Sequence, residues 1–336
     1  MQKLNQLHKK TNPLILGTWN FSSGYYSSIS KKERQQILRT AISSSLFHFD
    51  SAYSYGNGKS EQALSSGIKQ LVKENFLTQS DLKKFQISSK SLLKENFSVL
   101  DDIKKSLFRL NSDFLYAFFA HWPKPNKKYE NNFSQLRQAK EKGMIKKIGV
   151  SNFSLEDLIA LESICKIDVI QIGLNLLWLQ PLEDIIPYCK KNSIAIEIYA
   201  PLAQGLLSSN LTDKQETSNF PIFFDGRKKY LVFLQEQLFS QLMHILIQME
   251  EVAKPFKLQE AALLWLHQLI PDAYIVVGVS SANQLTQHLN LFSNKTDNKK
   301  MLSDSQFNEL FSLSQKAYNI VLSYFPNATN IFNHHI

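Results

Sequence analysis

Short apolar runs alternate with amphipathic stretches along most of the chain. Eight of the runs lack regular polar alternation and predict strands at 14–19, 47–52, 85–90, 114–122, 145–152, 169–175, 194–200 and 274–279. Between them, apolar residues recur three or four positions apart and predict helices at 30–44, 60–72, 99–110, 132–142, 155–165, 182–191 and 282–292. The first helix is expected to begin at Ser30, where Glu33 three residues later predicts a capping box.

This repeated order of strand and helix predicts a parallel sheet. A sheet that helices cover on both faces needs strands that are apolar throughout. Eight strand–helix units close naturally into a barrel, so we expect an α/β fold of the (β/α)8 TIM-barrel type. An open, doubly wound sheet is the alternative.

The alternation of strand and helix patterns is interrupted between residues 201 and 242. This stretch is too long for a plain loop and is typical of a lid or binding segment. A further helix is predicted at 307–317, before a polar end. The sequence contains no internal repeat and no low-complexity linker. We therefore expect residues 1–336 to form a single domain, with a long insertion at about 203–241 and a helical C-terminal tail.

The composition excludes several classes of protein. Hydrophobic residues make up 43% of the chain, which rules out wholesale disorder. The two cysteines are too few for a disulfide scaffold and favour a reducing compartment. The start of the chain has no apolar stretch of signal-peptide length, and the most apolar long segment, 231–252, is interrupted by Gln, Glu and His residues. We expect a cytoplasmic protein without a membrane span.

The chain is basic, with 38 Lys and Arg residues against 29 Asp and Glu residues and a net charge of +9. A positive charge attracts anions such as nucleic acids or phosphorylated cofactors. The basic residues are scattered, however, and no nucleic-acid-binding motif is present. We therefore attribute the charge to a general compositional bias and expect no nucleic-acid partner.

Four reactive side chains fall at or just after the carboxyl ends of three adjacent predicted strands, where the active site of an α/β barrel lies. They are Asp50 and Tyr55 after the second strand, Lys90 at the end of the third and His121 near the end of the fourth. A Lys–Asp pair beside a Tyr hydroxyl favours tyrosinate, so we expect the pKa of Tyr55 to lie below its usual value of about 10. Such a Tyr is a general acid at neutral pH, and a nearby His can hydrogen-bond the oxygen that is being protonated.

Two other kinds of site fit the sequence less well. Residues 56–60 resemble the end of a P-loop, but Tyr53 stands where the first Gly is needed, and the run does not continue as a Rossmann fingerprint. The eight His residues are spread out, without a His-x-His or His-Glu-x-x-His motif. We expect His48 to face away from the neighbours of Asp50, and we predict no metal site.

A series of motifs surrounds the four reactive side chains. Phe-Asp-Ser-Ala at 49–52 precedes Tyr55-Gly56, Ile-Ser-Ser-Lys lies at 87–90 and His-Trp-Pro at 121–123. The most specific motif is Gly-Met-Ile at 143–145 with Ile-Gly-Val-Ser-Asn-Phe at 148–153. Tyr-Ala-Pro-Leu at 199–202 and Gly-Leu-Leu at 205–207 come next in order. Over residues 14–289, the sequence resembles the aldo-keto reductase family.

The resemblance implies a barrel that binds NADP, or else NAD, in extended form without a Rossmann domain. By position, Tyr55 would donate the proton, Lys90 and Asp50 would tune it, and His121 would orient the substrate carbonyl. Trp19 and Trp122 would line the substrate pocket. The cofactor contacts that the resemblance implies are Gly17, Thr18, Trp19, Asp50, Ser151, Asn152, Gln171, Tyr199, Pro201, Leu202, Gln204, Gly205, Leu207, Gly278, Ser280, Gln284, Gln287 and His288.

Within this set the resemblance implies a different role for each group. Ser151, Asn152 and Gln171 would hold the nicotinamide carboxamide, while Tyr199 would stack on the ring. The loop at 201–207 would contact the pyrophosphate, and the adenosine end would meet Ser280, Gln284, Gln287 and His288.

The chain departs from the family pattern around the cofactor. Gln204 and the Ser-Ser-Asn run at 208–210 replace a small residue and a Gly-Lys pair beside the pyrophosphate. Gln284 stands where an Arg would bind a 2′-phosphate. Residues 227–229, Arg-Lys-Lys in the insertion, could supply that charge instead, although a solvated loop is the favoured interpretation.

The function we expect is NAD(P)H-dependent reduction of an aldehyde or ketone to an alcohol, with a small-molecule carbonyl compound as substrate. The alternative is a weakly catalytic or non-catalytic regulatory subunit that binds the cofactor and acts on a protein partner, as the potassium-channel β subunits of this family do. The sequence leaves open the physiological substrate, the choice between NADP and NAD, and the oligomeric state.

Overall fold

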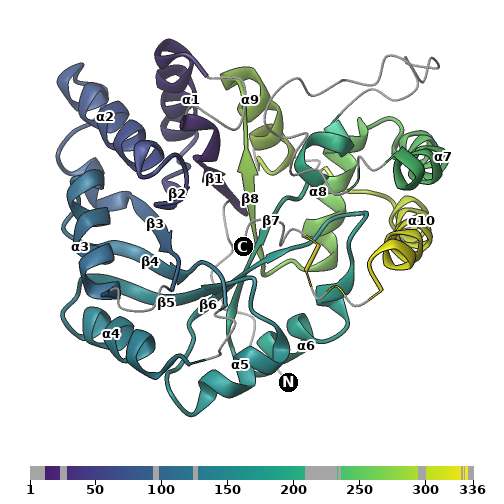
Figure 1. The fold of residues 1–336 in the computed structure, drawn as a ribbon. Coiled ribbons are helices and arrows are strands. Elements are labelled where there is room, and N and C mark those ends of the chain that lie inside the picture. Colours follow the sequence, from purple (N-terminus) through teal and green to yellow (C-terminus); the bar gives the residue numbers. More distant parts are fainter. Residues whose placement is uncertain are drawn as a thin grey trace, which may run out of the picture.

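The computed structural model describes residues 12–22, 29–93, 98–123, 128–208, 233, 236–293, 300–326, 328 and 330–331. Within these residues, eight parallel strands close into a barrel in chain order, and β8 pairs with β1 at the seam (Figure 1). The strands are β1 Leu14–Gly17, β2 His48–Asp50, β3 Gln86–Ser91, β4 Leu115–Ala120, β5 Ile145–Ser151, β6 Val169–Gly173, β7 Ala195–Tyr199 and β8 Tyr274–Gly278. The predicted (β/α)8 barrel is confirmed.

Helices surround the strands on the outside of the barrel (Figure 1). They are α1 Lys31–Ser43, α2 Lys59–Lys73, α3 Val99–Leu110, α4 Glu130–Glu141, α5 Leu155–Glu162, α6 Ile185–Lys191, α7 Glu236–Ala253, α8 Leu258–Leu269, α9 Ala282–Leu291 and α10 Asp304–Tyr324. Short 3-10 helices occur at η1 Trp19–Phe21, η2 Asp81–Lys84, η3 Gln180–Leu182 and η4 Ala203–Ser208.

The chain between β7 and β8 differs from expectation. Both α7 and α8 lie there, and neither was predicted; α7 begins inside the segment expected to be an insertion. The tail helix α10 is longer than predicted and packs against α7 outside the barrel (Figure 1). The basic residues 227–229 lie outside the described residues. None of the described helices is long and apolar enough to cross a membrane.

The capping box predicted for α1 was half wrong. Ser30 does cap the helix, because its side chain accepts a hydrogen bond from the Glu33 backbone N–H. The Glu33 carboxylate does not return the bond, but accepts one from the backbone N–H of Ala282 at 2.7 Å. Glu33 therefore ties α1 to the start of α9, next to the seam where β1 meets β8.

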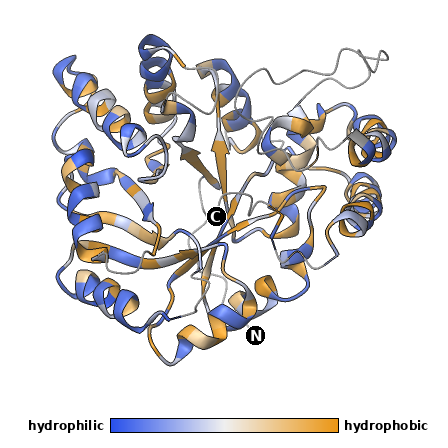
Figure 2. Ribbon diagram, in the orientation of Figure 1, coloured by the Kyte–Doolittle hydropathy of each residue, from blue (hydrophilic) through white to orange (hydrophobic). Residues whose placement is uncertain are grey.

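The packing explains why most of the strands are rich in apolar residues. One side of each strand faces the surrounding helices, and the other faces the inside of the barrel. Figure 2 shows hydrophobic residues along the strands, whereas the helices carry both hydrophilic and hydrophobic residues. Inside the barrel, Ala117, Phe119 and Val169 form a small separate apolar cluster. Gly149 makes room for it, because a Cβ there would overlap the Phe119 ring.

Candidate active site

The four reactive side chains predicted from the sequence converge at one end of the barrel. Asp50 is the last residue of β2, Lys90 lies next to the end of β3, and His121 directly follows β4. Strands β2, β3 and β4 are neighbours in the barrel, so their carboxyl ends lie side by side. Tyr55 lies in the loop between β2 and α2.

Lys90 is the centre of this group and is fully buried, at 0% exposure. Its Nζ donates hydrogen bonds to Asp50 Oδ2 at 2.6 Å, to the Ser51 carbonyl at 2.9 Å and to Tyr55 Oη at 3.2 Å. An ammonium group has three protons. Lys90 thus has an acceptor for each of them, which offsets the cost of burying its charge.

The pKa of Tyr55 differs from the expectation. Burial raises it above the ordinary value of 10.0, aided by Asp50 and opposed by the Lys90 ammonium. The expected lowering was therefore wrong, because desolvation outweighs the neighbouring cation. Burial also lowers the pKa of Lys90, but Asp50 and Tyr55 outweigh it and raise the pKa overall. Tyr55 thus holds its proton, and Lys90 its charge, at neutral pH.

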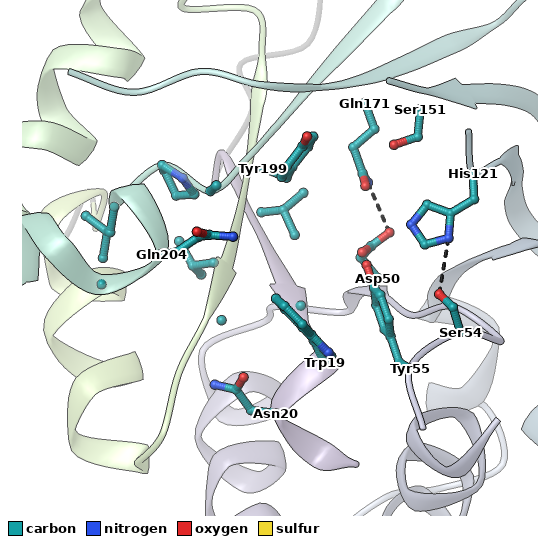
Figure 3. A pocket seen from close by; sticks show the side chains of 18 of the residues that line it. Trp19, Asn20, Asp50, Ser54, Tyr55, His121, Ser151, Gln171, Tyr199 and Gln204 are labelled. Carbon is teal, nitrogen blue, oxygen red and sulfur yellow. Dashed lines mark hydrogen bonds between the residues drawn. The ribbon is translucent and has the colours of Figure 1, made fainter. Parts of the chain in front are cut away.

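His121 presents a neutral imidazole to the site. Burial, and then the Lys90 charge, lower its pKa well below 6.5. A hydrogen bond of 3.2 Å joins its Nδ1 to the Ser54 hydroxyl (Figure 3). Its ring meets that of Tyr55 edge-on, with 5.9 Å between centroids. Ser54 belongs to no motif, and the sequence analysis missed it.

These residues border a cavity of about 540 Å³, a volume typical of small-molecule sites. Of the residues that the sequence analysis proposed, those that line it are Gly17, Trp19, Asp50, Tyr55, His121, Trp122, Ser151, Asn152, Gln171, Tyr199, Pro201, Leu202, Gln204, Gly205, Gly278, Ser280 and Gln284. Figure 3 shows Tyr55 and His121 on one side of the pocket and Gln204 on the other. Lining residues outside the set of contacts proposed from the sequence are Asn20, Ser54, Leu92, Ala200, Ser208, Val276 and Val277.

The remaining proposed residues lie away from the cavity surface. Thr18 is buried, and its hydroxyl donates to the Asp50 carbonyl at 3.0 Å. Lys90 reaches the site only through its bonds to Asp50 and Tyr55. Leu207 and His288 are each 0% exposed, and Gln287 is half-buried on α9 outside the lining. Burial lowers the pKa of His288 to about 4, so it is neutral.

Asn152 organises the amide-rich side of the cavity. Its Nδ2 donates to the His121 carbonyl and to Ser151 Oγ, each at 3.0 Å. Its Oδ1 accepts from Tyr199 Oη at 2.6 Å and from Asn330 Nδ2 at 2.7 Å. Asn330 comes from the chain beyond α10, and no sequence signal placed it here.

Gln171 lies deeper in the barrel, between two carboxylates. Its Nε2 donates to Asp50 Oδ1 at 3.1 Å and to Glu197 Oε2 at 2.9 Å. His48 Nε2 lies 4.0 Å from Glu197 Oε1. The expectation that His48 faces away from the neighbours of Asp50 was therefore wrong, because side chains two apart on a strand share a face. A Glu within the apolar run of β7 was the overlooked signal.

The loop after β7 brings its backbone to the cavity in an unusual conformation. Ala200, Ala203 and Gln204 have φ values of 50°, 47° and 56°, in the left-handed region that disfavours residues with a Cβ. Gly205 follows at 104°. Strain of this kind is common at ligand-binding segments. Among the described residues, no group of three or more His, Cys, Asp or Glu residues is placed to hold a metal ion.

Comparison with known proteins identifies relatives of the chain. The family model described as "Aldo/keto reductase family" matches residues 13–309. A curated relative, aldo-keto reductase YhdN of Bacillus subtilis (strain 168), is 26% identical over 244 residues, which is 71% of this chain and 71% of the relative.

Solved structures show the same fold. The glycerol dehydrogenase from Gluconobacter oxydans superposes with a TM-score of 0.71 at 21% identity, covering 94% of this chain and 93% of its own. An aldo/keto reductase from Klebsiella pneumoniae, in complex with NADP and acetate, gives a TM-score of 0.66 at 21% identity, covering 90% and 91%.

Proposed function

Because the chain belongs to the aldo/keto reductase family, we propose that it reduces an aldehyde or ketone to an alcohol with a nicotinamide dinucleotide. The observation that carries the proposal is the bond from the buried Lys90 ammonium to the Tyr55 hydroxyl, at the edge of the cavity. The reductase and dehydrogenase names of the relatives support the same chemistry. None of the relatives named above is described as a regulatory subunit.

The cavity fits an extended nicotinamide cofactor. Ser151, Asn152 and Gln171 place a hydroxyl and two carboxamides on one side, which suits the hydrogen bonds of a nicotinamide amide. Gly17, Gly205 and Gly278 line the wall without a Cβ, so a ligand can approach the backbone closely. Ser280 and Gln284 lie at the start of α9 and would hold the far end of the cofactor.

The residues around Lys90 would provide the acid chemistry. When bound, a reduced nicotinamide would supply the hydride that reduction of the carbonyl carbon requires. Tyr55 donates its Oη proton to the carbonyl oxygen, and the C=O bond becomes CH–OH. The Lys90 ammonium stabilises the tyrosinate that remains, and solvent returns the proton. The neutral His121 has one N–H with which to hydrogen-bond the carbonyl oxygen.

The substrate is a small molecule with an apolar part rather than a nucleic acid. Trp19, Leu92 and Trp122 supply apolar cavity walls beside Tyr55 and His121. Both cysteines are free and buried, which supports a reducing compartment, and we place the protein in the cytoplasm.

The cofactor is NADP(H) or NAD(H), and direct titration decides between them. The described residues lining the cavity include no Lys or Arg that would pair with a 2′-phosphate. We therefore expect both cofactors to bind, with a modest difference in Kd. Loss of reduced-nicotinamide absorbance with a panel of aldehydes and ketones would then test turnover. Failure of the protein to bind either cofactor would refute the proposal.

A further inference from the structure

A second carboxylate lies inside the barrel, beneath the Asp50–Lys90 pair. Glu197 is the central residue of β7 and is 1% exposed. A carboxylate with so little access to water is costly unless hydrogen bonds and cations compensate it. The groups around Glu197 therefore decide what it does.

A chain of hydrogen bonds connects Glu197 to Tyr55. Glu197 Oε2 accepts from Gln171 Nε2, which also donates to Asp50 Oδ1. The other oxygen of Asp50 accepts from Lys90, which donates to Tyr55 Oη. The amide –NH₂ of Gln171 thus has one carboxylate for each of its two protons. This clamp fixes which way the amide is turned, and Gln171 lines the cavity.

Glu197 is surrounded by groups of both signs from five other strands. They are His48 and Asp50 from β2, Lys90 from β3, Tyr116 from β4, Lys147 from β5 and Tyr274 from β8. Burial, followed by the Asp50 charge, raises the pKa of Glu197 to about 7, against the Gln171 hydrogen bond and the charges of Lys90 and Lys147. A carboxyl that titrates in this range changes charge near neutral pH.

We propose that Glu197 is a positioning residue, which holds the Gln171 amide in place for the cofactor carboxamide and makes cofactor binding respond to pH. The inference rests on the proposed function. Ionised Glu197 is the stronger acceptor for Gln171, because charge-assisted hydrogen bonds are about twice as strong as neutral ones. The cofactor therefore binds more tightly at pH values above the pKa of Glu197 than at pH values below it.

The first test needs no cofactor. The folded-state pKa of Glu197, about 7, lies above the unfolded value of about 4.3. The folded protein then binds this proton more tightly, so stability falls as pH rises from the unfolded to the folded pKa. We therefore compare the unfolding equilibrium constants of the wild type and of Glu197→Gln. As pH rises between these two pKa values, we expect the ratio of the wild-type constant to the variant constant to rise on the order of 100-fold. If the unfolding free energies of the two proteins change in parallel with pH, Glu197 does not titrate in this range.

The second test measures the Kd of NADP⁺ against pH. The wild-type Kd should fall as pH rises through neutrality, whereas Glu197→Gln keeps an acceptor for Gln171 and should lack this step. Glu197→Leu removes the acceptor and should weaken binding about tenfold at high pH. Asp157→Asn removes another buried carboxylate, at the start of α5 outside the barrel, and should retain the wild-type step.

The outcomes separate this inference from the proposed function. If the wild type binds the cofactor with a Kd that does not change with pH, or if Glu197→Leu binds it as tightly as the wild type does, the proposed role of Glu197 is refuted. The proposed reductase function is unaffected by either result. No cofactor binding by the wild type at any pH would refute both, while the unfolding curves would still report how Glu197 titrates.

Discussion

Lys90 donates a hydrogen bond to the phenolic oxygen of Tyr55 across 3.2 Å, from a position with no exposure to solvent. Tyr55, by contrast, borders the cavity, where a ligand would meet its hydroxyl. In the proposed reaction, proton delivery would thus fall to Tyr55, which meets the ligand, and charge stabilisation to Lys90, which does not.

Substitution of Tyr55 by Phe tests the proton donor. The ring and its packing remain, but the hydroxyl proton is lost. We expect kcat for carbonyl reduction to fall by about 100- to 10,000-fold, the usual contribution of a positioned general acid. The Kd of the cofactor should stay within a few-fold, as titration can show. Near-normal kcat in the variant would assign the proton to another group.

Substitution of Lys90 by Met tests the buried ion pair. The variant leaves the Asp50 carboxylate buried without its cation, which typically costs about 3–5 kcal/mol of unfolding free energy. Urea unfolding would measure the loss. The double variant Lys90→Met with Asp50→Asn removes the charge that would be left behind, so it should regain part of the stability. A double variant no more stable than the single one would contradict the electrostatic explanation.

The dependence of stability on pH in the acid range tests whether the fold holds His121 neutral. Its folded-state pKa lies well below the unfolded value of about 6.5. The unfolded chain then binds the proton more readily, so the wild type should lose stability as pH falls below about 6.5. His121→Asn cannot titrate and should lose less over the same range. Thermal unfolding at a series of pH values compares the two, and equal slopes would show that His121 is not held neutral by the fold.

The tail contact tests whether Asn330 competes with the cofactor. Its Nδ2 donates to Asn152 Oδ1, which belongs to the proposed carboxamide cradle. The oxygen also accepts from Tyr199 Oη, so removal of the side chain in Asn330→Ala should free one of its two acceptor positions and tighten cofactor binding several-fold. Asn290→Ala, at an exposed position near the end of α9, is the matched control and should bind as the wild type does. Weaker binding by Asn330→Ala would show that the tail supports the site instead.

The barrel was predictable because strands such as β1, β4 and β8 are apolar on both sides, a requirement that the surrounding helices and the barrel interior impose together. The same reasoning placed Asp50, Lys90 and His121 at neighbouring strand ends. It did not find α7 or α8: residues 201–242, where α7 begins, were interpreted as a break in the pattern, and no helix was predicted between residue 243 and β8.

Other features depend on surroundings that a linear sequence does not display. The pKa of Tyr55 was predicted from two nearby charges, whereas burial is the larger cause and acts in the other direction. Ser54 and Asn330 carry no motif, and they reach His121 and Asn152 only because the folded chain brings them there. Glu197 was visible as an acid in an apolar strand, and alternation along β7 would have placed it on the same face as Tyr199.

The seam between β1 and β8 also has a consequence for biosynthesis. The edge of β1 that pairs with β8 gains its partner only when residues 275–278 have left the ribosome. The hydrogen bond from the Ala282 backbone N–H to Glu33 forms later still. Until then, a nascent chain with several strands already assembled presents an open sheet edge. Most of translation therefore passes before the barrel can close, and the unfinished chain is exposed to aggregation during that time.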